Sequence, residues 1–141
     1  MDVARQKEWR KKIMKYGYSK TVSLSMEVTE SNIRKSLRDV GFGVLTEIDV
    51  QNAMKEKLGE TFRPYKILGA CNPPIAFQAL SEEIEIGLLL PCNIVLWEND
   101  NQSVTVAAID AKAMLSVTGR NDMAEMADHI NGLLHTAIDA V

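Results

Sequence analysis

The segment CNIVLWENDNQSVTVAAI, residues 92–109, decides the fold class. Two runs rich in branched and aromatic residues, 92–98 and 103–109, flank the turn Asn99-Asp100-Asn101, which is the pattern of a β-hairpin. A hairpin joins antiparallel strands, whereas parallel strands need a long crossover connection. The segment therefore argues against a purely parallel sheet. It predicts an α+β fold, with a largely antiparallel sheet and the main helices packed on one face.

Hydrophobic periodicity and capping residues predict the remaining elements. The helix after residue 27 is expected to start at Thr29, and the last helix has the capping-box spacing of Asp122 and Glu125. The stripe of the last helix includes Met123 and Met126. A cofactor box is one interpretation of this pair, but the helical spacing favours core, because methionine fills irregular gaps. The other expected elements are strands at 20–27, 42–50 and 63–71, and helices at 51–58, at 76–83 after a start at Asn72, and at 111–117 after Asp110.

Length and composition limit the protein class. The chain has 141 residues, of which 46% are hydrophobic and 25% charged, and this composition is typical of a globular domain and not of a disordered chain. The sequence has no apolar run long enough to span a bilayer and no secretory signal pattern. Two cysteines do not make an extracellular disulfide scaffold, so we expect a cytoplasmic protein.

The charge is unevenly distributed along the chain. Residues 1–20 hold seven Lys/Arg against two Asp/Glu, and the other 121 residues hold nine against 17. Because the body is acidic, we expect no nucleic-acid partner. We read residues 1–16 as a basic amphipathic arm and residues 17–141 as a single α+β domain. Trp9, Ile13 and Tyr16 form one helical stripe, which fits packing on the domain, packing on a second subunit, or contact with an anionic surface.

The two cysteines are the candidate site. Cys71 closes one expected strand and Cys92 opens the next, and each is followed by an asparagine, Asn72 or Asn93. If those strands are antiparallel neighbours, the two thiols come together at one end of the sheet; if the strands are parallel, the thiols lie far apart. Tyr65 shares a strand face with Cys71 and is expected to line the same hollow.

A close thiol pair permits reversible disulfide formation, soft-metal binding by Cys71 and Cys92, or transfer of sulfur or a thiol adduct. The helix start expected at Asn72 favours anions and would lower a thiol pKa. Two cysteines alone do not complete a tetrahedral zinc site. The alternative without function is that both are buried and behave as small hydrophobic residues.

Three motifs resemble the bacterial and archaeal domain-of-unknown-function family 302: GFGVLTEIDV at 41–50, FRPYKILGACNPP at 62–74 and LLPCN at 89–93. The resemblance covers about residues 17–141. It implies a β-α-β(4)-α arrangement like that of the TATA-binding protein with extra short helices, and a tendency to form homodimers. It carries over no activity. The positions that match the family's motif are Cys71, Asn72, Pro73, Pro91, Cys92 and Asn93.

The sequence therefore favours a small binding or redox domain centred on Cys71 and Cys92, with a soft metal, sulfur compound or other small molecule as ligand. Asn72 and Asn93 would orient that ligand. One alternative is a small-molecule enzyme with Cys71 as nucleophile, and another is a purely structural homodimeric interaction module. No reaction and no cofactor can be assigned from the sequence.

Overall fold

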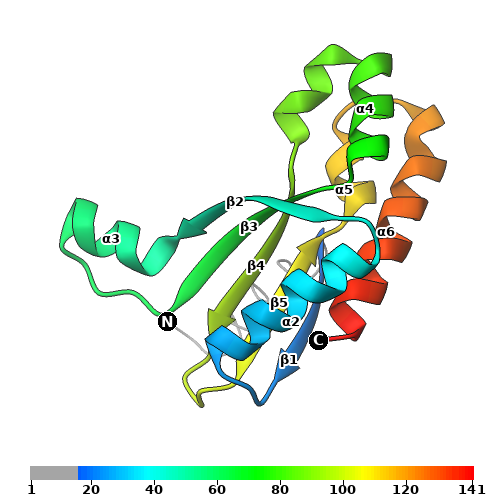
Figure 1. Ribbon diagram of the computed structural model, residues 1–141. Coiled ribbons are helices and arrows are strands. Elements are labelled where there is room, and N and C mark those ends of the chain that lie inside the picture. Colours follow the sequence, from blue (N-terminus) through cyan, green and yellow to red (C-terminus); the bar gives the residue numbers. More distant parts are fainter. Residues whose placement is uncertain (1–15) are drawn as a thin grey trace, which may run out of the picture.

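The computed structural model describes residues 16–141 and contains a five-stranded sheet in the order β1-β5-β4-β3-β2. All neighbouring strands are antiparallel, which confirms the predicted α+β class (Figure 1). The predicted arm lies outside the described residues except for Tyr16. The elements are β1 (Gly17–Val22), α2 (Met26–Asp39), β2 (Gly43–Asp49), α3 (Val50–Leu58), β3 (Tyr65–Cys71), α4 (Pro73–Glu82), the 3-10 helix η2 (Ile84–Leu89), β4 (Cys92–Glu98), β5 (Val104–Ile109), α5 (Ala111–Ser116), the 3-10 helix η3 (Asn121–Met123) and α6 (Ala124–Asp139).

The order of the strands and of the two longest helices is β-α-β(4)-α, with the shorter helices inserted between them. This is the element order that the family resemblance implied. Likeness to the TATA-binding protein itself stays a prediction.

The β4–β5 hairpin forms where the sequence predicted it. The backbone N–H of Asn99 donates to the carbonyl of Ser103 at 2.8 Å. The Asn99 side chain accepts from Trp97 Nε1 at 3.0 Å and donates to Thr105 Oγ1 at 2.9 Å. One asparagine thus satisfies polar groups on both strands and stabilises the turn.

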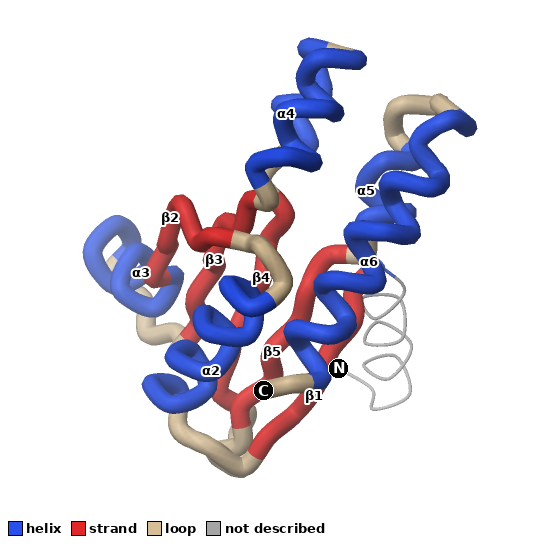
Figure 2. Tube along the Cα trace, turned by 45° about the vertical axis from the view of Figure 1, so that its right-hand side comes forward, coloured by secondary structure: helices blue, strands red, loops and turns tan. Residues whose placement is uncertain are grey.

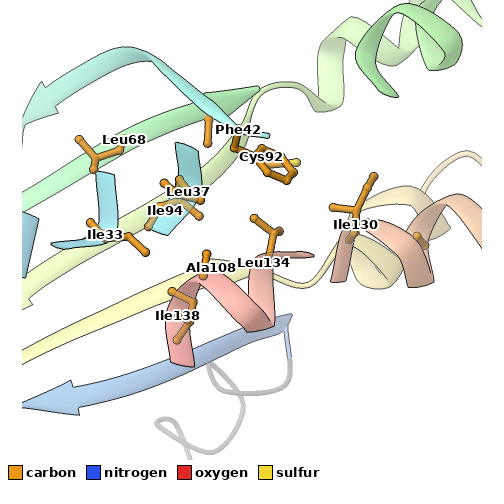
Figure 3. Packing of buried hydrophobic residues seen from close by; sticks show 14 of the residues in the cluster. Ile33, Leu37, Phe42, Leu68, Cys92, Ile94, Ala108, Ile130, Leu134 and Ile138 are labelled. Carbon is orange, nitrogen blue, oxygen red and sulfur yellow. The ribbon is translucent and has the colours of Figure 1, made fainter. Parts of the chain in front are cut away.

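The two long helices, α2 and α6, pack on the same face of the sheet (Figure 2). Alternate residues of the strands point into this layer, so Ile94, Leu96 and Val106 have no exposed surface. Leu134 and Ile138 of α6 belong to the same buried cluster and lie on its helix side (Figure 3). The core between sheet and helices is where most of the apolar area is removed from water, which is the main source of stability.

The opposite face of the sheet, which we call the open face, carries neither α2 nor α6 (Figure 2). Most of its residues are half-buried or exposed. The strand register and side-chain alternation assign to it Ser19, Thr21, Thr46, Ile48, Tyr65, Ile67, Gly69, Cys71, Asn93, Val95, Trp97, Thr105, Ala107 and Ile109.

Two predicted element starts were wrong. The strand expected at 20–27 is β1, which ends at Val22, and the N-cap of α2 is Ser25, whose Oγ accepts from the Val28 N–H at 3.1 Å. Thr29 is instead buried in the first turn of that helix, where its hydroxyl donates to the Ser25 carbonyl. Met26 fits the alternating pattern of the strand, but it is the first residue of helix α2.

The capping box predicted for the last helix was also wrong. Helix α6 starts at Ala124 without a side-chain cap, because the Asp122 carboxylate binds the Arg120 guanidinium at 2.7 and 3.0 Å. The interpretation of the methionines as core is supported: Met123 is 2% exposed, and Met126 packs against the core cluster.

Helix α4 and the following η2 extend beyond one end of the sheet, and α5 with the first turns of α6 extends beyond the same end (Figures 1 and 2). This end of the sheet is the one at which β3 stops and β4 begins. Among the described residues, every helix is too short or too polar to cross a membrane.

Candidate functional site

The two cysteines lie on neighbouring strands at one end of the sheet. Cys71 is the last residue of β3 and Cys92 the first of β4, and the strands pair antiparallel with Ala70 opposite Cys92. The topology that the dithiol hypothesis needed is therefore present. Neither cysteine is in a disulfide.

The register adds a restriction that the sequence did not predict. Because Ala70 pairs with Cys92, the Cys92 side chain belongs to the helix-covered face, and Cys71, one residue further, belongs to the open face. The two Cβ atoms thus start on opposite sides of the sheet. Cys92 is 5% exposed, whereas Cys71 is half-buried.

Both cysteines nevertheless line one small cavity of about 30 Å³ at this end of the sheet, which we call the rim cavity. Its walls come from the end of the sheet, from α4 and η2, and from α5 and α6. Except for Asn72, the lining residues are apolar or sulfur-bearing. They are Phe42, Ala70, Cys71, Asn72, Ile75, Ala76, Ala79, Ile86, Leu90, Pro91, Cys92, Met114, Leu115, Met126 and Ile130.

The size of the rim cavity limits what it can hold. Pockets for drug-sized ligands have volumes of roughly 300–1,000 Å³, which is at least about ten times the 30 Å³ found here. A water molecule needs at least about 10–15 Å³ of such space and several polar partners. The cavity therefore suits an ion or one very small molecule, and its apolar walls offer little to a hydrated ion.

Burial controls the acidity of the Cys92 thiol. Desolvation first, and the coulombic effect of the neighbouring Cys71 second, raise the pKa of Cys92 to about 11. Burial penalises the charged thiolate, so the pKa of Cys92 moves in the direction opposite to the one that a helix start favours. Cys92 is a neutral thiol at pH 7 and a poor nucleophile on its own.

The residues flanking the cysteines shape the backbone. Asn72 is the N-cap of α4 and its Oδ1 accepts from the Ile75 N–H at 3.3 Å, while Pro73 is the first helical residue. This confirms the predicted helix start. On the open face, a Cβ added to Gly69 would meet the Thr46 hydroxyl and would stand 2.7 Å from Cγ of the Pro91 ring. Pro91 and Gly69 therefore pack closely where β3 and β4 meet.

Tyr65 and Asn93 line a different place from the thiols. Both line a hollow of about 220 Å³ on the open face, where the rings of Tyr65 and Trp97 stack at 5.9 Å and 11°. The structure thus divides the predicted site residues: Cys71, Asn72, Pro91 and Cys92 line the rim cavity, and Tyr65 and Asn93 line the hollow. Pro73 is exposed and lines neither.

Sequence reasoning missed the contribution of methionine to the rim cavity. Met114 was not singled out, and Met126 was assigned only to the core. Together with the two cysteines they give the cavity four sulfur-bearing residues, from β3, β4, α5 and α6. The signal for them is weak, because methionines on a helical stripe are usually core residues.

Zinc is a poor fit to this donor set. Structural zinc sites use four Cys or His ligands, and catalytic sites use three protein ligands from His, Cys or carboxylates. Within residues 16–141 no group of three or more His, Cys, Asp or Glu side chains is placed to hold a metal ion. Any metal in the rim cavity would have to accept two thiols with thioether sulfur.

The family described as "Domain of unknown function DUF302" matches residues 18–141, so the chain belongs to this family. Among solved structures, the uncharacterized conserved protein DUF302 from Bacillus stearothermophilus superposes with a TM-score of 0.83. It is 28% identical, and the match covers 89% of this chain and 97% of that one. No curated protein matches the chain. Family and fold are thereby confirmed.

Proposed function

We propose that this DUF302 protein is a binding module that holds a soft monovalent metal ion of the Cu(I) type in the rim cavity. The Sγ atoms of Cys71 and Cys92 would be the principal ligands, and the thioethers of Met114 and Met126 would complete the set. The observation that carries the proposal is that all four sulfur-bearing residues line one small apolar cavity.

Ligand chemistry favours Cu(I) over other metals. Thiolate and thioether sulfur select Cu(I), whereas carboxylate, carbonyl and water ligands suit Mg²⁺, Ca²⁺ and Mn²⁺. Among the described residues that line the cavity, Asn72 alone has a side-chain amide, and its oxygen already caps α4. A cavity of about 30 Å³ accepts a bare ion more readily than a hydrated one or an organic ligand.

Electrostatics support a cation between the thiols. The charge on Cys71 contributes to the raised pKa of Cys92, so two thiolates at this position repel each other when nothing lies between them. A bound cation reverses this effect by stabilising both thiolates. Binding would therefore release thiol protons, and affinity would fall as the pH is lowered.

A metal is favoured over an intramolecular disulfide by the register. Cysteines whose Cβ vectors point apart cannot form a disulfide without backbone movement, and these two Cβ atoms start on opposite sides of the sheet. A disulfide needs sulfurs about 2.05 Å apart, whereas two sulfurs that share a metal stand roughly 3.5–4 Å apart. Reducing conditions, such as those of the cytoplasm, would keep both thiols available.

A small-molecule enzyme with Cys71 as nucleophile is the second candidate. The asymmetry of the thiols favours it, because Cys71 is half-buried while Cys92 is buried and neutral. The cavity volume argues against it, since the rim cavity has no room for an organic substrate beside the thiol. This candidate predicts that Cys71→Ser abolishes turnover and that Cys92→Ser does not.

A homodimeric interaction module is the third candidate, favoured by the uncovered apolar residues of the open face. It predicts that replacing both cysteines changes nothing and that the chain sediments as a dimer.

A dimer that pooled its thiols around one metal would bind one Cu(I) per two chains. Sedimentation of the loaded protein therefore separates this arrangement from a site within one chain.

Titration with Cu(I) under nitrogen, in competition with the chromogenic chelator bicinchoninate, tests the proposed function. The intact chain should withdraw one Cu(I) per chain from the chelator, and Cys71→Ala or Cys92→Ala should abolish this. Met114→Leu and Met126→Leu should weaken it, whereas Met54→Leu, the matched control in α3 and away from the cavity, should not. The proposal fails if the double cysteine variant withdraws as much copper as the intact, folded chain.

A further inference from the structure

The open face has an aromatic hollow at its centre. Its lining includes the aromatic residues Tyr16, Tyr65 and Trp97 and the small apolar residues Val95 and Ala107. The rings of Tyr65 and Trp97 are stacked. Surfaces of this kind, apolar and concave within an otherwise polar exterior, are usually covered by another segment or molecule.

The chemistry of the hollow indicates an apolar occupant. Within residues 16–141, the ten residues that line it are uncharged, and the Trp97 indole N–H is already bonded to Asn99. Burial first, and the neighbouring Tyr16 hydroxyl second, raise the pKa of Tyr65. Tyr16 and Tyr65 are therefore close together although 49 positions separate them in the chain.

The first described residue, Tyr16, lies at the hollow. Tyr16 lines the hollow, and its carbonyl accepts from the Asp110 N–H at 2.8 Å, which fixes the backbone just before β1. Residues 1–15 precede it directly. Fifteen residues span about 22 Å as a helix, and four spacings of about 4.8 Å give the five-stranded sheet a width of roughly 19 Å. The segment is thus long enough to cross the open face.

The sequence of this segment complements the hollow. Trp9, Ile13 and Tyr16 stand at positions i, i+4 and i+7, which is the spacing of one apolar helical stripe. The segment also carries six Lys/Arg against two Asp/Glu, while the rest of the chain is acidic. We propose that residues 1–15 of the same chain cover the open face, with Trp9 and Ile13 against the hollow and the basic side chains toward water. This proposal is independent of the metal site.

The test uses Trp97 as a reporter in a Trp9→Phe background, where it is the single tryptophan. Deletion of residues 1–13 should move the Trp97 emission to longer wavelength and increase its quenching by acrylamide. In the full-length chain Ile13→Gln should produce part of this change, and the matched control Lys11→Gln, on the other side of the stripe, should produce none. Far-UV circular dichroism checks that each variant is folded.

The proposal is overturned if Trp97 is quenched equally with and without residues 1–13, or if Ile13→Gln has no more effect than Lys11→Gln. If quenching instead changes with protein concentration, and the chain sediments as a dimer whether or not the segment is present, a second copy covers the face. If neither the deletion nor dilution changes the quenching, the hollow is open to a small ligand, and the proposal is again wrong.

Discussion

Raising the pH from 8 to 10.5 should destabilise the folded protein through Cys92. Burial and the charge of Cys71 raise the pKa of Cys92 from 9.0 to about 11 in the fold. A raised pKa means that the folded state holds the proton more tightly, so the stabilisation is complete below pH 9 and is lost as the pH rises toward 11. One pKa unit corresponds to about 1.4 kcal/mol, so the loss by pH 10.5 is about 2 kcal/mol.

Urea denaturation at the two pH values, with a reductant present, measures this loss. Tyrosines and lysines also titrate in this range, so the informative quantity is the difference between the intact chain and Cys92→Ala. The intact chain should lose about 2 kcal/mol more than the variant does. Cys71→Ala keeps Cys92 and should retain most of the loss. Equal losses in the intact chain and in Cys92→Ala would refute the account of Cys92 as a buried neutral thiol.

Three further substitutions test the fold around the site. Gly69→Ala places a Cβ onto Thr46 Oγ1 and should cost about 1–3 kcal/mol in urea, whereas Gly132→Ala, which meets nothing within 4 Å, should not destabilise. Asn72→Ala removes the cap of α4 and should cost about 1 kcal/mol by thermal melting; an unchanged melting temperature would contradict the capping role. Partial burial raises the pKa of Asp110, but hydrogen bonds from a side-chain amide and two backbone N–H groups outweigh it and lower the pKa below its usual value. Stability should therefore fall as the pH drops below about 4, and a melting curve of Asp110→Ala should show a smaller fall; an equal fall would contradict this.

The sequence predicted the sheet well where side-chain chemistry and local turns agree. The β4–β5 hairpin has alternating apolar residues and a turn rich in asparagine, and both signals indicate the same structure. Asn72 and Pro73 likewise mark the start of α4 unambiguously. These local signals, combined in chain order, were sufficient for an antiparallel sheet with helices on one face.

Element boundaries were predicted less well where two patterns overlap. Met26 continues the alternation of the first strand, yet it begins α2, because Ser25 supplies the cap. Asp122 has capping-box spacing, but it forms an ion pair with Arg120 instead. Local side-chain contacts decided both positions, that of Ser25 with the Val28 N–H and that of Asp122 with Arg120, and hydrophobic periodicity alone does not reveal them.

The candidate site was predicted in outline only. The sequence placed Cys71 and Cys92 at strand ends that meet only if the two strands are antiparallel neighbours, and the strand order and pairing show that they are. The strand order does not determine the register between β3 and β4, and a register shift of one residue moves a side chain to the other face of the sheet. Nothing in the sequence fixed the pairing of Ala70 with Cys92. The approach of Met114 and Met126 depends on how α5 and α6 pack beyond the sheet, which sequence spacing does not determine.

X-ray absorption spectroscopy at the copper edge tests the proposed sulfur site most directly. The chain loaded with one Cu(I) should show sulfur as the only type of neighbouring atom, and Met114→Leu with Met126→Leu should lower the number of sulfur neighbours while two thiolates remain. Nitrogen or oxygen coordination, or the same spectrum from a chain in which both cysteines are alanine, would contradict the proposal that the rim cavity is a metal site.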